Sequence, residues 1–216
     1  MLTNEDYAKA FHEIKNSITI INSSLQLLEK QHPELSAYEY WTESRDTLDY
    51  LRQMVQELSQ VNFASDFVLQ PTNLNLLLKN ILASIRSLND NNGCECKSNI
   101  EENLPMIGAD SMRLNQAIMN LIKNAFESMN MQGTIHLNAY QKNHSISIDI
   151  IDFGGGIPSD LIETLFSPFV TSKPGGTGLG LSISQQIIEN HHGTLNYVSR
   201  PGDGCTFTII LPILNC

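Results

Sequence analysis

The chain has 216 residues, which is long enough for one large or two modest domains, each with its own core. Its formal net charge of −10 argues against a protein that tracks nucleic acid, because that role needs clustered Lys and Arg. No apolar run could span a membrane, and the first residues, MLTNEDYAKA, lack the regions of a secretory signal. We therefore expect a cytoplasmic chain without membrane contact of its own.

The first part of the chain is predicted to form two amphipathic helices. In residues 5–31, apolar side chains recur at steps of three and four residues in turn, which is the spacing of helices that supercoil against neighbours. His32-Pro33 ends this helix. A second helix is expected from about Ala37 to Asn62. Two helices alone bury too little apolar surface, so we expect a dimeric four-helix bundle over residues 1–66. The predicted contact positions are Phe11, Ile14, Ile18, Ile21, Leu25 and Leu28 in the first helix and Leu48, Leu51, Val55 and Leu58 in the second.

The stretch FHEIKNSITI places an unusual polar cluster on the first helix. His12, Glu13, Lys15 and Asn16 fall within five residues, and Asn16 lies one helical turn from His12. Any one of these side chains could be ordinary helix surface. The cluster alone therefore favours an ordinary solvated face over a functional site.

Residues 67–73 are interpreted as a linker to a second, mixed domain over residues 74–216. Thr72 or Asn73 is a candidate N-cap for a helix that reaches about Leu88. A polar loop follows, which holds Cys94 and Cys96. Their spacing, like that of Cys205 and Cys216, fits neither a metal site nor a redox motif, so we interpret all four as reduced thiols.

The rest of this domain alternates between helical and strand patterns. A short strand is expected at Lys97 to Ile100, and a helix from about Asp110 to Met129. TIHLNAY with SISIDII, and TLNYVSR with CTFTIIL, are predicted to form two hairpins. Between them a helix runs from about Leu179 to His191, closed by Gly193 as C′ residue. The predicted fold class is α+β, an α/β sandwich with helices on one face of a largely antiparallel sheet.

Asn120 and Asn124 share one face of the helix predicted from Asp110 to Met129. Their carboxamides could bind a hydrated Mg²⁺ that bridges phosphates, since Mg²⁺ keeps several waters and needs few protein ligands. Two solvated amides on an amphipathic helix explain the same spacing. The pair is therefore a candidate metal site that needs further support.

Two glycine-rich segments follow. In DFGGGIP, at the end of a predicted strand, Asp152 can accept a hydrogen bond from an exocyclic amine, and the glycines let a flat ring approach the backbone. GGTGLGL, residues 175–181, opens a helix whose first N–H groups can bind an anion. It matches neither the dinucleotide fingerprint nor the P-loop. Taken singly, the first segment is also compatible with a plain turn and the second with a flexible loop.

The order of these features resembles the ATP-binding domain of sensor histidine kinases, in the Bergerat-type ATPase superfamily that includes gyrase and MutL. NLIKNAFESM resembles the asparagine box, DFGGGIP the first glycine box, LFSPFVTSK the phenylalanine box and GGTGLGLSIS the second glycine box. GDGCTFTIILP is similar to the last family signature, and HEIKN to the phosphoacceptor box of the dimerisation helix. The resemblance covers essentially the whole chain.

The resemblance implies ATP and Mg²⁺ as cofactors and assigns residues to them. Asn124 would be the Mg²⁺ ligand, with Asn120 assisting through the metal or its waters. Asp152 would bind the adenine amine, in a pocket that Gly154 and Gly156 shape. These residues would form the adenine and metal side of the site.

The resemblance also implies contacts to the phosphates. Glu127 stands where many members have a phosphate-contacting Lys, so Lys123 and Lys173 are the basic candidates. This departure and the short lid from Ile157 to Lys173 resemble the nitrogen-regulator and sporulation kinases. Thr206 is a further candidate on the adenine side. The loop residues implied to surround the phosphates are Gly176, Thr177, Gly178, Leu179 and Gly180.

With an ATP domain in the same chain, the HEIKN cluster gains an implied role. His12 can attack a γ-phosphate because neutral imidazole is abundant near neutral pH, and Glu13 can act as its general base. Asn16 holds the position where the family places its phosphatase residue. Ser17 replaces a common Pro, so the helix need not kink there.

The function implied by the resemblance is that of a two-component sensor histidine kinase core. It would act as a homodimer, autophosphorylate His12 from Mg-ATP, and pass the phosphoryl group to an aspartate of a response regulator receiver domain. Asn16 would support dephosphorylation of that partner.

Two other classes compete with this interpretation. A histidine phosphotransfer protein with a vestigial ATP domain would need neither Asn124 nor Asp152, and a nucleotide-binding titration separates it from a kinase. A serine-directed Bergerat kinase of the anti-sigma type would give the helical hairpin with HEIKN no role.

Overall fold

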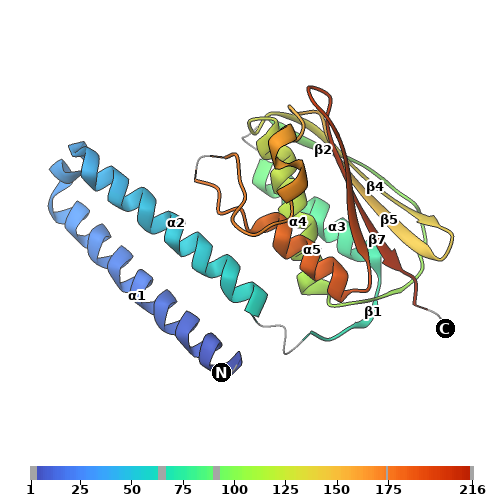
Figure 1. The fold of residues 1–216 in the computed structure, drawn as a ribbon, viewed down its shortest axis with the longest axis horizontal. Coiled ribbons are helices and arrows are strands. Elements are labelled where there is room, and N and C mark those ends of the chain that lie inside the picture. Colours follow the sequence, from blue (N-terminus) through green and yellow to red (C-terminus); the bar gives the residue numbers. More distant parts are fainter. Residues whose placement is uncertain (1–3, 63–66, 90–92, 174, 215–216) are drawn as a thin grey trace. The chain divides into compact units, whose positions relative to one another are not determined.

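The computed structural model describes residues 4–62, 67–89, 93–173 and 175–214 (Figure 1). The chain divides into two compact units. The first unit contains Met1–Phe67 together with Phe169–Leu179, and the second contains Val68–Pro168 together with Gly180–Cys216. The segment between Phe169 and Leu179, which holds most of the second glycine box, thus groups with the helical unit.

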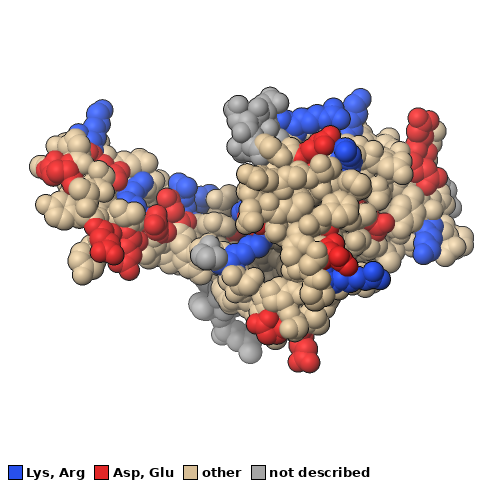
Figure 2. Space-filling model, turned by 90° about the horizontal axis from the view of Figure 1, so that it is seen from above, with Lys and Arg blue, Asp and Glu red and all other residues tan. Residues whose placement is uncertain are grey.

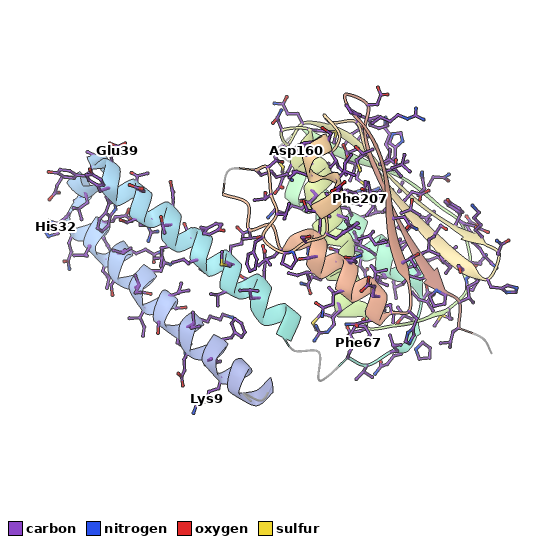
Figure 3. The ribbon with its side chains drawn as sticks, in the orientation of Figure 1. Lys9, His32, Glu39, Phe67, Asp160 and Phe207 are labelled. Atoms are coloured by element: carbon purple, nitrogen blue, oxygen red, sulfur yellow. The ribbon has the colours of Figure 1, made fainter. Side chains whose placement is uncertain are left out.

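The first unit is built around the predicted helical hairpin. Helix α1 spans Asn4–Gln31, helix α2 spans Glu39–Asn62, and a 3-10 turn over Pro33–Ala37 joins them. Figure 3 labels His32 and Glu39 beside this turn and Lys9 towards the other end of α1. Pro33 lies at the first position of the turn, where its missing N–H costs no hydrogen bond. The hairpin prediction is confirmed.

Only half of the predicted contact positions on α1 are used within the hairpin. Ile18 is buried against Leu48 and Val55 of α2, with Phe11 and Leu25 packed against them. The alternate positions remain open: Ile14, Ile21 and Leu28 are 45%, 49% and 41% exposed. One chain therefore buries one side of the apolar stripe and leaves the other side at the surface.

The second unit contains a five-stranded mixed sheet. Its strands are β2 (Cys94–Ile100), β4 (Gly133–Lys142), β5 (Ser145–Asp152), β6 (Thr194–Arg200) and β7 (Gly204–Pro212). They lie in the order β2-β4-β5-β7-β6. Only β2 and β4 pair in parallel, and the other neighbours are antiparallel. Both predicted hairpins and the largely antiparallel sheet are confirmed.

Three helices cover one face of this sheet, which confirms the sandwich prediction (Figure 1). They are α3 (Leu74–Asn89), α4 (Ser111–Ser128) and α5 (Gly180–Asn190), and a 3-10 turn lies at Ser159–Thr164. Asp110 caps α4 by accepting a hydrogen bond from the N–H of Arg113. A small antiparallel pair, β1 (Gln70–Thr72) with β3 (Ile107–Ala109), was not predicted.

Side chains alternate between the two faces of the sheet, as the period of a strand requires. Ile148 and Ile150 of β5 and Ile209 of β7 are buried under the helices. Asp149 of β5 lies on the opposite face, where it accepts a hydrogen bond of 2.7 Å from the Thr208 hydroxyl. The core therefore sits between the sheet and its helices, and the other face of the sheet is polar.

Two local predictions were wrong. Strand β2 begins at Cys94, so both cysteines of the predicted polar loop belong to the sheet. At the end of α5, His192 rather than Gly193 adopts the left-handed conformation, with φ 59. Gly193 follows it and donates its N–H to the carbonyl of Ile188 at 2.9 Å. Glycine is needed there because a Cβ would come within 2.5 Å of the Ile210 carbonyl oxygen.

Within the described ranges, no helix combines the length and apolar character that a membrane crossing requires. The face of the molecule in Figure 2 carries Lys and Arg side chains interspersed with Asp and Glu. This mixed surface agrees with a chain whose acidic side chains outnumber its basic ones.

Candidate functional site

A row of polar side chains runs along α4. Asn120, Asn124 and Ser128 follow each other at steps of four residues and are half-buried. The other side of the helix is buried in the core, with Leu121, Ile122 and Ala125 among its residues. Because the apolar side fixes the rotation of α4, the polar row must face away from the core.

Asp152 lies where β5 ends and is only 3% exposed. Its Oδ1 accepts hydrogen bonds from the N–H of Gly154 and from the Ser128 hydroxyl, both at 2.9 Å. These bonds connect the first glycine box to the asparagine helix. Because both end on Oδ1, the second carboxylate oxygen, Oδ2, can accept a hydrogen bond from a ligand.

Ser128 was not among the predicted site residues. Its hydroxyl lies 2.9 Å from Asp152 Oδ1 and 2.8 Å from the Ala125 carbonyl oxygen, and its single proton is shared between these two acceptors. A side chain on Gly154 would collide with Ser128, since its Cβ would come within 2.6 Å of the Ser128 carbonyl oxygen. The close approach of these two segments explains the glycine, and Gly156 similarly packs against the backbone of Arg200.

Strand alternation separates Thr206 from the other candidates on the adenine side. Thr206 pairs with Ile151 and lies on the polar face of the sheet, whereas Cys205 pairs with Asp152 and lies on the helix-covered face. Cys205 is buried, and burial together with the Asp152 charge raises the pKa of its thiol to about 12. The structure therefore brings Cys205, rather than Thr206, next to Asp152.

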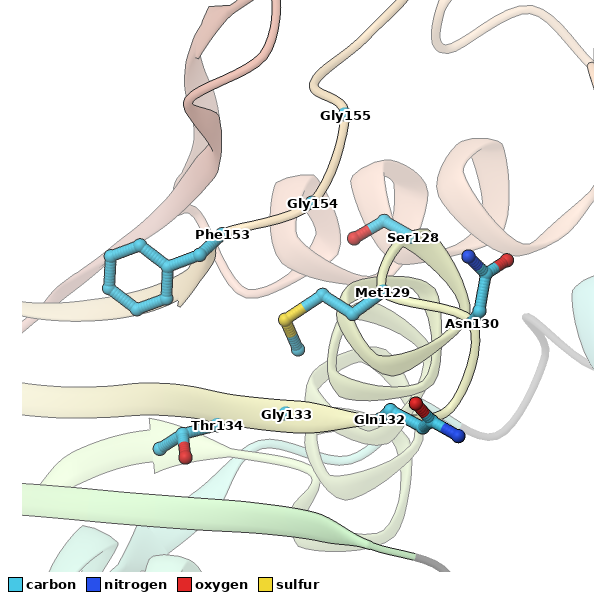
Figure 4. Close-up of a pocket in the computed structure, with 9 residues that line it drawn as sticks. All are labelled: Ser128, Met129, Asn130, Gln132, Gly133, Thr134, Phe153, Gly154 and Gly155. Carbon is cyan, nitrogen blue, oxygen red and sulfur yellow. The ribbon is translucent and has the colours of Figure 1, made fainter.

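A pocket of about 510 Å³ opens beside the Ser128–Gly154 contact (Figure 4). One wall is the end of α4 and the following turn, and the other is Phe153 to Gly155. In Figure 4 the Ser128 side chain points towards Gly154, and the Met129 side chain lies between Phe153 and Thr134. Asp152 is not among the residues that line this pocket. The pocket therefore lies next to the candidate adenine contact and does not contain it.

The second glycine box is divided between the two units. Gly176, Thr177, Gly178 and Leu179 belong to the first unit, and Gly180 begins α5 of the second. Gly178 has φ +67 and accepts a hydrogen bond from the N–H of Phe169 at 3.0 Å. Thr177 is buried, and its hydroxyl donates to a Glu57 carboxylate oxygen. The structure thus defines the local conformation of this part of the loop.

The two basic candidates differ in their surroundings. The Lys123 ammonium lies 3.7 Å from the Glu127 carboxylate, one turn further along α4. Lys173 closes the turn that starts the glycine loop, since its carbonyl accepts the N–H of Gly176 at 3.1 Å. Glu127 therefore partly neutralises the positive charge of Lys123.

The cluster of the HEIKN stretch lies on the exposed surface of α1. His12, Glu13 and Asn16 are all exposed. The side-chain nitrogen of Asn16 lies 3.1 Å from Nδ1 of His12. The hydroxyl of Ser17 donates to the Glu13 carbonyl at 2.9 Å, within an unbroken helix. The structure thus brings His12 and Asn16 into contact and exposes both to an incoming partner.

Comparison with known proteins supports the family suggested by these motifs. The family of histidine kinase-, DNA gyrase B-, and HSP90-like ATPases matches residues 109–215. The signal transduction histidine-protein kinase AtoS of Escherichia coli (strain K12) is 33% identical over 203 residues, which are 94% of this chain and 33% of AtoS. The sensory histidine kinase/phosphatase NtrB of Vibrio alginolyticus is 34% identical over 215 residues, covering 94% of this chain and 60% of NtrB.

Solved structures lead to the same family. The catalytic domain of histidine kinase ThkA is 30% identical with a TM-score of 0.60, covering 66% of this chain and 96% of that domain. The chain belongs to the histidine kinase family. Histidine kinase ThkA in complex with response regulator protein TrrA is 27% identical with a TM-score of 0.69, covering 97% of this chain and 61% of that one.

This histidine kinase chain spans between 33% and 60% of the length of these two curated relatives. The similarity to both relatives extends over 94% of the chain, so it includes the helical hairpin as well as the ATPase-like unit. Both relatives are therefore similar to this chain in the hairpin and in the ATPase-like unit.

The donor set fits Mg-ATP. Among the described residues, no three His, Cys, Asp or Glu side chains gather as a metal site of their own. A metal held by carboxamides, waters and phosphates needs no such cluster, and Mg²⁺ prefers this kind of coordination. The buried Asp152 carboxylate, with Oδ2 available to an amine, fits an adenine ring.

A buried histidine links the two helices that carry the site motifs. His191, at the end of α5, accepts a hydrogen bond from the N–H of Asp110 on Nε2 at 3.0 Å. Its Nδ1 lies 2.7 Å from the Ile187 carbonyl, to which Nδ1–H donates in this tautomer. Burial lowers the pKa of His191, against the opposing effect of the hydrogen bonds to Ile187 and Asp110. The neutral ring therefore fixes the start of α4 against the end of α5.

We expect this contact to weaken in mild acid. The unfolded chain takes up a proton near the ordinary histidine value of 6.5, whereas the folded chain resists it because the folded pKa is lower. The stabilisation is thus complete above about pH 6.5 and is lost as the pH falls below it. Amide hydrogen exchange of α4 should speed up between pH 7.5 and 5.5, after correction for intrinsic rates. In a His191→Gln variant, the free energy of opening that protects these amides should fall by about 1–3 kcal/mol at pH 7.5, so they should exchange faster. The exchange rate of this variant should change less with pH. Equal pH responses would contradict the assignment.

Proposed function

We propose that this chain is the catalytic core of a two-component sensor histidine kinase, of the nitrogen-regulator and sporulation-kinase type. It autophosphorylates His12 from Mg-ATP and passes the phosphoryl group to an aspartate of a response regulator receiver domain. The observation that carries this proposal is the buried Asp152 carboxylate, held by Gly154 and Ser128 at the end of the asparagine row of α4. This arrangement suits an adenine amine, and the exposed His12 supplies an acceptor in the same chain.

The nucleotide side uses the row on α4. Asp152 accepts the adenine amine on Oδ2, while the bonds to Oδ1 keep the carboxylate in place. Asn124 lies one turn from Ser128, towards the start of α4, and its carboxamide would be the protein ligand of Mg²⁺. Asn120, a further turn along, would assist through the metal or its waters. Bound Mg-ATP supplies the phosphoryl group and the cation that neutralises its charge.

The loop side surrounds the phosphates. The first N–H groups of α5, beginning at Gly180, have no partner within the helix and favour an anion. Gly176 to Leu179 cover the phosphates with backbone N–H groups, and Lys173 adds a positive charge.

The acceptor side uses the exposed cluster on α1. His12 attacks the γ-phosphorus with a ring nitrogen, in line with the departing ADP oxygen. Glu13, the next residue, accepts the proton that the imidazole loses after the attack. Because His12 and Glu13 are both exposed, the nucleotide-bound unit can reach them from solvent.

The partner is proposed from relatives. The solved complex joins histidine kinase ThkA to response regulator protein TrrA, and this chain is similar to ThkA over 97% of its own length. A receiver aspartate that docks over His12 takes the phosphoryl group. Asn16, which contacts His12, can orient a water that hydrolyses the phosphoryl group from the receiver aspartate.

The proposal is tested by incubating the chain with γ-labelled ATP and Mg²⁺. Label should appear on the protein, resist base and be lost in acid, as a phosphorus–nitrogen bond requires. Chelation of Mg²⁺ should prevent labelling, and adding candidate receiver domains should move the label to one of them. Acid-stable label would instead indicate a serine-directed kinase. A chain that binds no ATP but accepts phosphate from a receiver would be a phosphotransfer protein.

Phosphatase activity is proposed for the same surface and is measured separately. Wild type with ADP should accelerate phosphate loss from a phosphorylated receiver domain, and Asn16→Ala should lose this acceleration. Full acceleration by the Asn16→Ala variant would contradict a phosphatase role for Asn16.

We also infer that the active form is a homodimer. Ile14, Ile21 and Leu28 form a row at seven-residue spacing on α1 and are each more than 40% exposed. Leu51 of α2 is 42% exposed as well. A second copy would bury both sets in a four-helix bundle, which is the common way to complete such a hairpin.

The dimer is tested by changing one residue of this row. Ile21→Lys should halve the mass that light scattering measures in solution, because a charge in the bundle core lacks a partner. Ile20→Lys is a matched control, since Ile20 is 67% exposed and lies outside the row. A dimeric Ile21→Lys variant would exclude this interface.

A further inference from the structure

The turn between β6 and β7 lies against the first glycine box. The N–H of Gly202 in this turn donates to the carbonyl of Gly155 at 3.0 Å. A Cβ on Gly156 would come within 2.6 Å of the Arg200 carbonyl oxygen, which is closer than side chains tolerate. The two segments therefore meet backbone to backbone, with no room for a side chain at Gly156.

Ser199 adds a side-chain contact beside this turn. It is half-buried near the end of β6, and its Oγ accepts a hydrogen bond of 2.8 Å from the N–H of Ile157. Its hydroxyl can donate to the Gly204 carbonyl, which is 3.4 Å away and so makes a weaker bond. Ile157 follows Gly156 and is the first residue of the predicted lid. Ser199 therefore joins the exit of the glycine box to the β6–β7 hairpin.

Ser199 also lies in the same row of the sheet as the proposed adenine contact. It pairs with Cys205 of β7, which in turn pairs with Asp152 of β5, and paired residues point to the same face of a sheet. The row thus crosses three strands on the helix-covered face. Asp152 holds the beginning of the glycine box through the N–H of Gly154, and Ser199 holds its exit. The box is therefore fixed at both ends from one row.

The glycine box depends on such anchors because its middle has little conformational preference of its own. Gly154, Gly155 and Gly156 are consecutive, and Gly156 has φ +76, which residues with a side chain rarely adopt. Glycine loses more backbone freedom on folding than any other residue. A hydrogen bond at the exit therefore reduces the range of positions that Gly156 and Ile157 can sample.

We propose that Ser199 is a positioning residue for the nucleotide site, whose Oγ holds the Ile157 N–H and thereby fixes the glycine box relative to Asp152. This rests on the proposed kinase function, in which Gly154 and Gly156 shape the adenine pocket. Ser199 acts through Ile157 and belongs to none of the contacts proposed for ATP itself. Its hydroxyl lowers the conformational cost of binding, because this part of the pocket is formed before the nucleotide arrives.

The experiment measures ATP binding and autophosphorylation kinetics of the full chain and its variants. Ser199→Ala removes the acceptor of the Ile157 N–H and should raise both the Kd and the KM for ATP about three- to tenfold, as loss of one hydrogen bond predicts. The kcat should keep its wild-type value, because ground state and transition state lose the same binding free energy. Ser199→Thr keeps a hydroxyl and should bind ATP like wild type. Ser145→Ala makes the same change on a half-buried serine at the opposite end of β5 from Asp152, and should alter neither constant.

Amide hydrogen exchange of Ile157 is the second measurement. This amide should exchange faster in Ser199→Ala than in wild type, and at the wild-type rate in Ser199→Thr. If Ser199→Ala folds poorly, Ser199→Val and Ser199→Thr carry the same comparison, since both are β-branched and only threonine has the hydroxyl.

Two results would overturn the proposal. One is unchanged ATP affinity in the variants that lack the hydroxyl. The other is a lower kcat at an unchanged KM, which a general loss of folded protein produces. If wild type binds no ATP, the proposed kinase function fails, and the exchange of the Ile157 amide still decides whether Ser199 fixes the exit of the glycine box.

Discussion

Replacing His12 with glutamine should remove all covalent phosphate from the chain while leaving ATP binding unchanged. Glutamine keeps a polar side chain of similar reach on the exposed surface of α1, so the helix should persist. It has no nucleophilic ring nitrogen, so no phosphorus–nitrogen bond can form. The nucleotide contacts proposed for Asn124 and Asp152 lie in the other compact unit and should be unaffected. Labelling from γ-labelled ATP and a nucleotide titration measure the two quantities.

His32→Gln is the matched control for this variant. His32 belongs to the same compact unit, is exposed, and lies 3.0 Å from the Glu34 carboxylate beside the hairpin turn. Its ring nitrogen is paired with an acidic side chain, yet His32 lies outside the HEIKN stretch. Full labelling of His32→Gln with none of His12→Gln would assign the acceptor. Label that persists in His12→Gln would place it on another residue.

The fold could be predicted from the sequence where one periodicity dominates. The apolar spacing of α1 and α2 and the alternation along β4, β5, β6 and β7 identified these elements, because each pattern reports which face is buried. The pairing of β1 with β3 was missed because three-residue strands are too short to show a period. Strand β2 was predicted too short because Cys94 and Cys96 lie among polar residues in NDNNGCECKSN.

The candidate site could be predicted where a motif carries its own chemistry. Residue type and spacing made the asparagine pair and the two glycine-rich segments candidates, and their order along the chain, which resembles the histidine kinase ATP-binding domain, assigned them to a site. Ser128 and His191 were missed because their roles depend on partners far along the chain, Asp152 and Asp110. Cys205 was passed over for its neighbour Thr206, since a motif does not tell which of two adjacent strand residues faces the helices. Only the pairing of Asp152 with Cys205 decides that.

Replacing Asp152 with asparagine should weaken ATP binding on the order of a hundredfold and reduce labelling of His12 in proportion. The carboxylate can accept hydrogen bonds on both oxygens, whereas asparagine has one acceptor and one donor. Gly154 N–H and the Ser128 hydroxyl already donate to Oδ1, so the new amide N–H would face the proposed adenine amine, another donor. A lost hydrogen bond to a charged group costs about 1.5–3 kcal/mol, and a buried donor without an acceptor adds to this.

Asp149→Asn makes the same chemical change on the same strand and is therefore the matched control. Asp149 lies on the polar face of β5, bonded to Thr208 and turned away from the helices. The Asp149→Asn variant should bind ATP with the affinity of wild type. Thermal unfolding of both variants would show whether the sheet remains intact. A stable Asp152→Asn chain with wild-type affinity would remove Asp152 from the adenine site. Equal losses of ATP affinity in the two variants would instead indicate a general disturbance of strand β5. A role in the adenine site predicts a loss only for Asp152→Asn, because Asp152 lies on the helix-covered face and Asp149 does not.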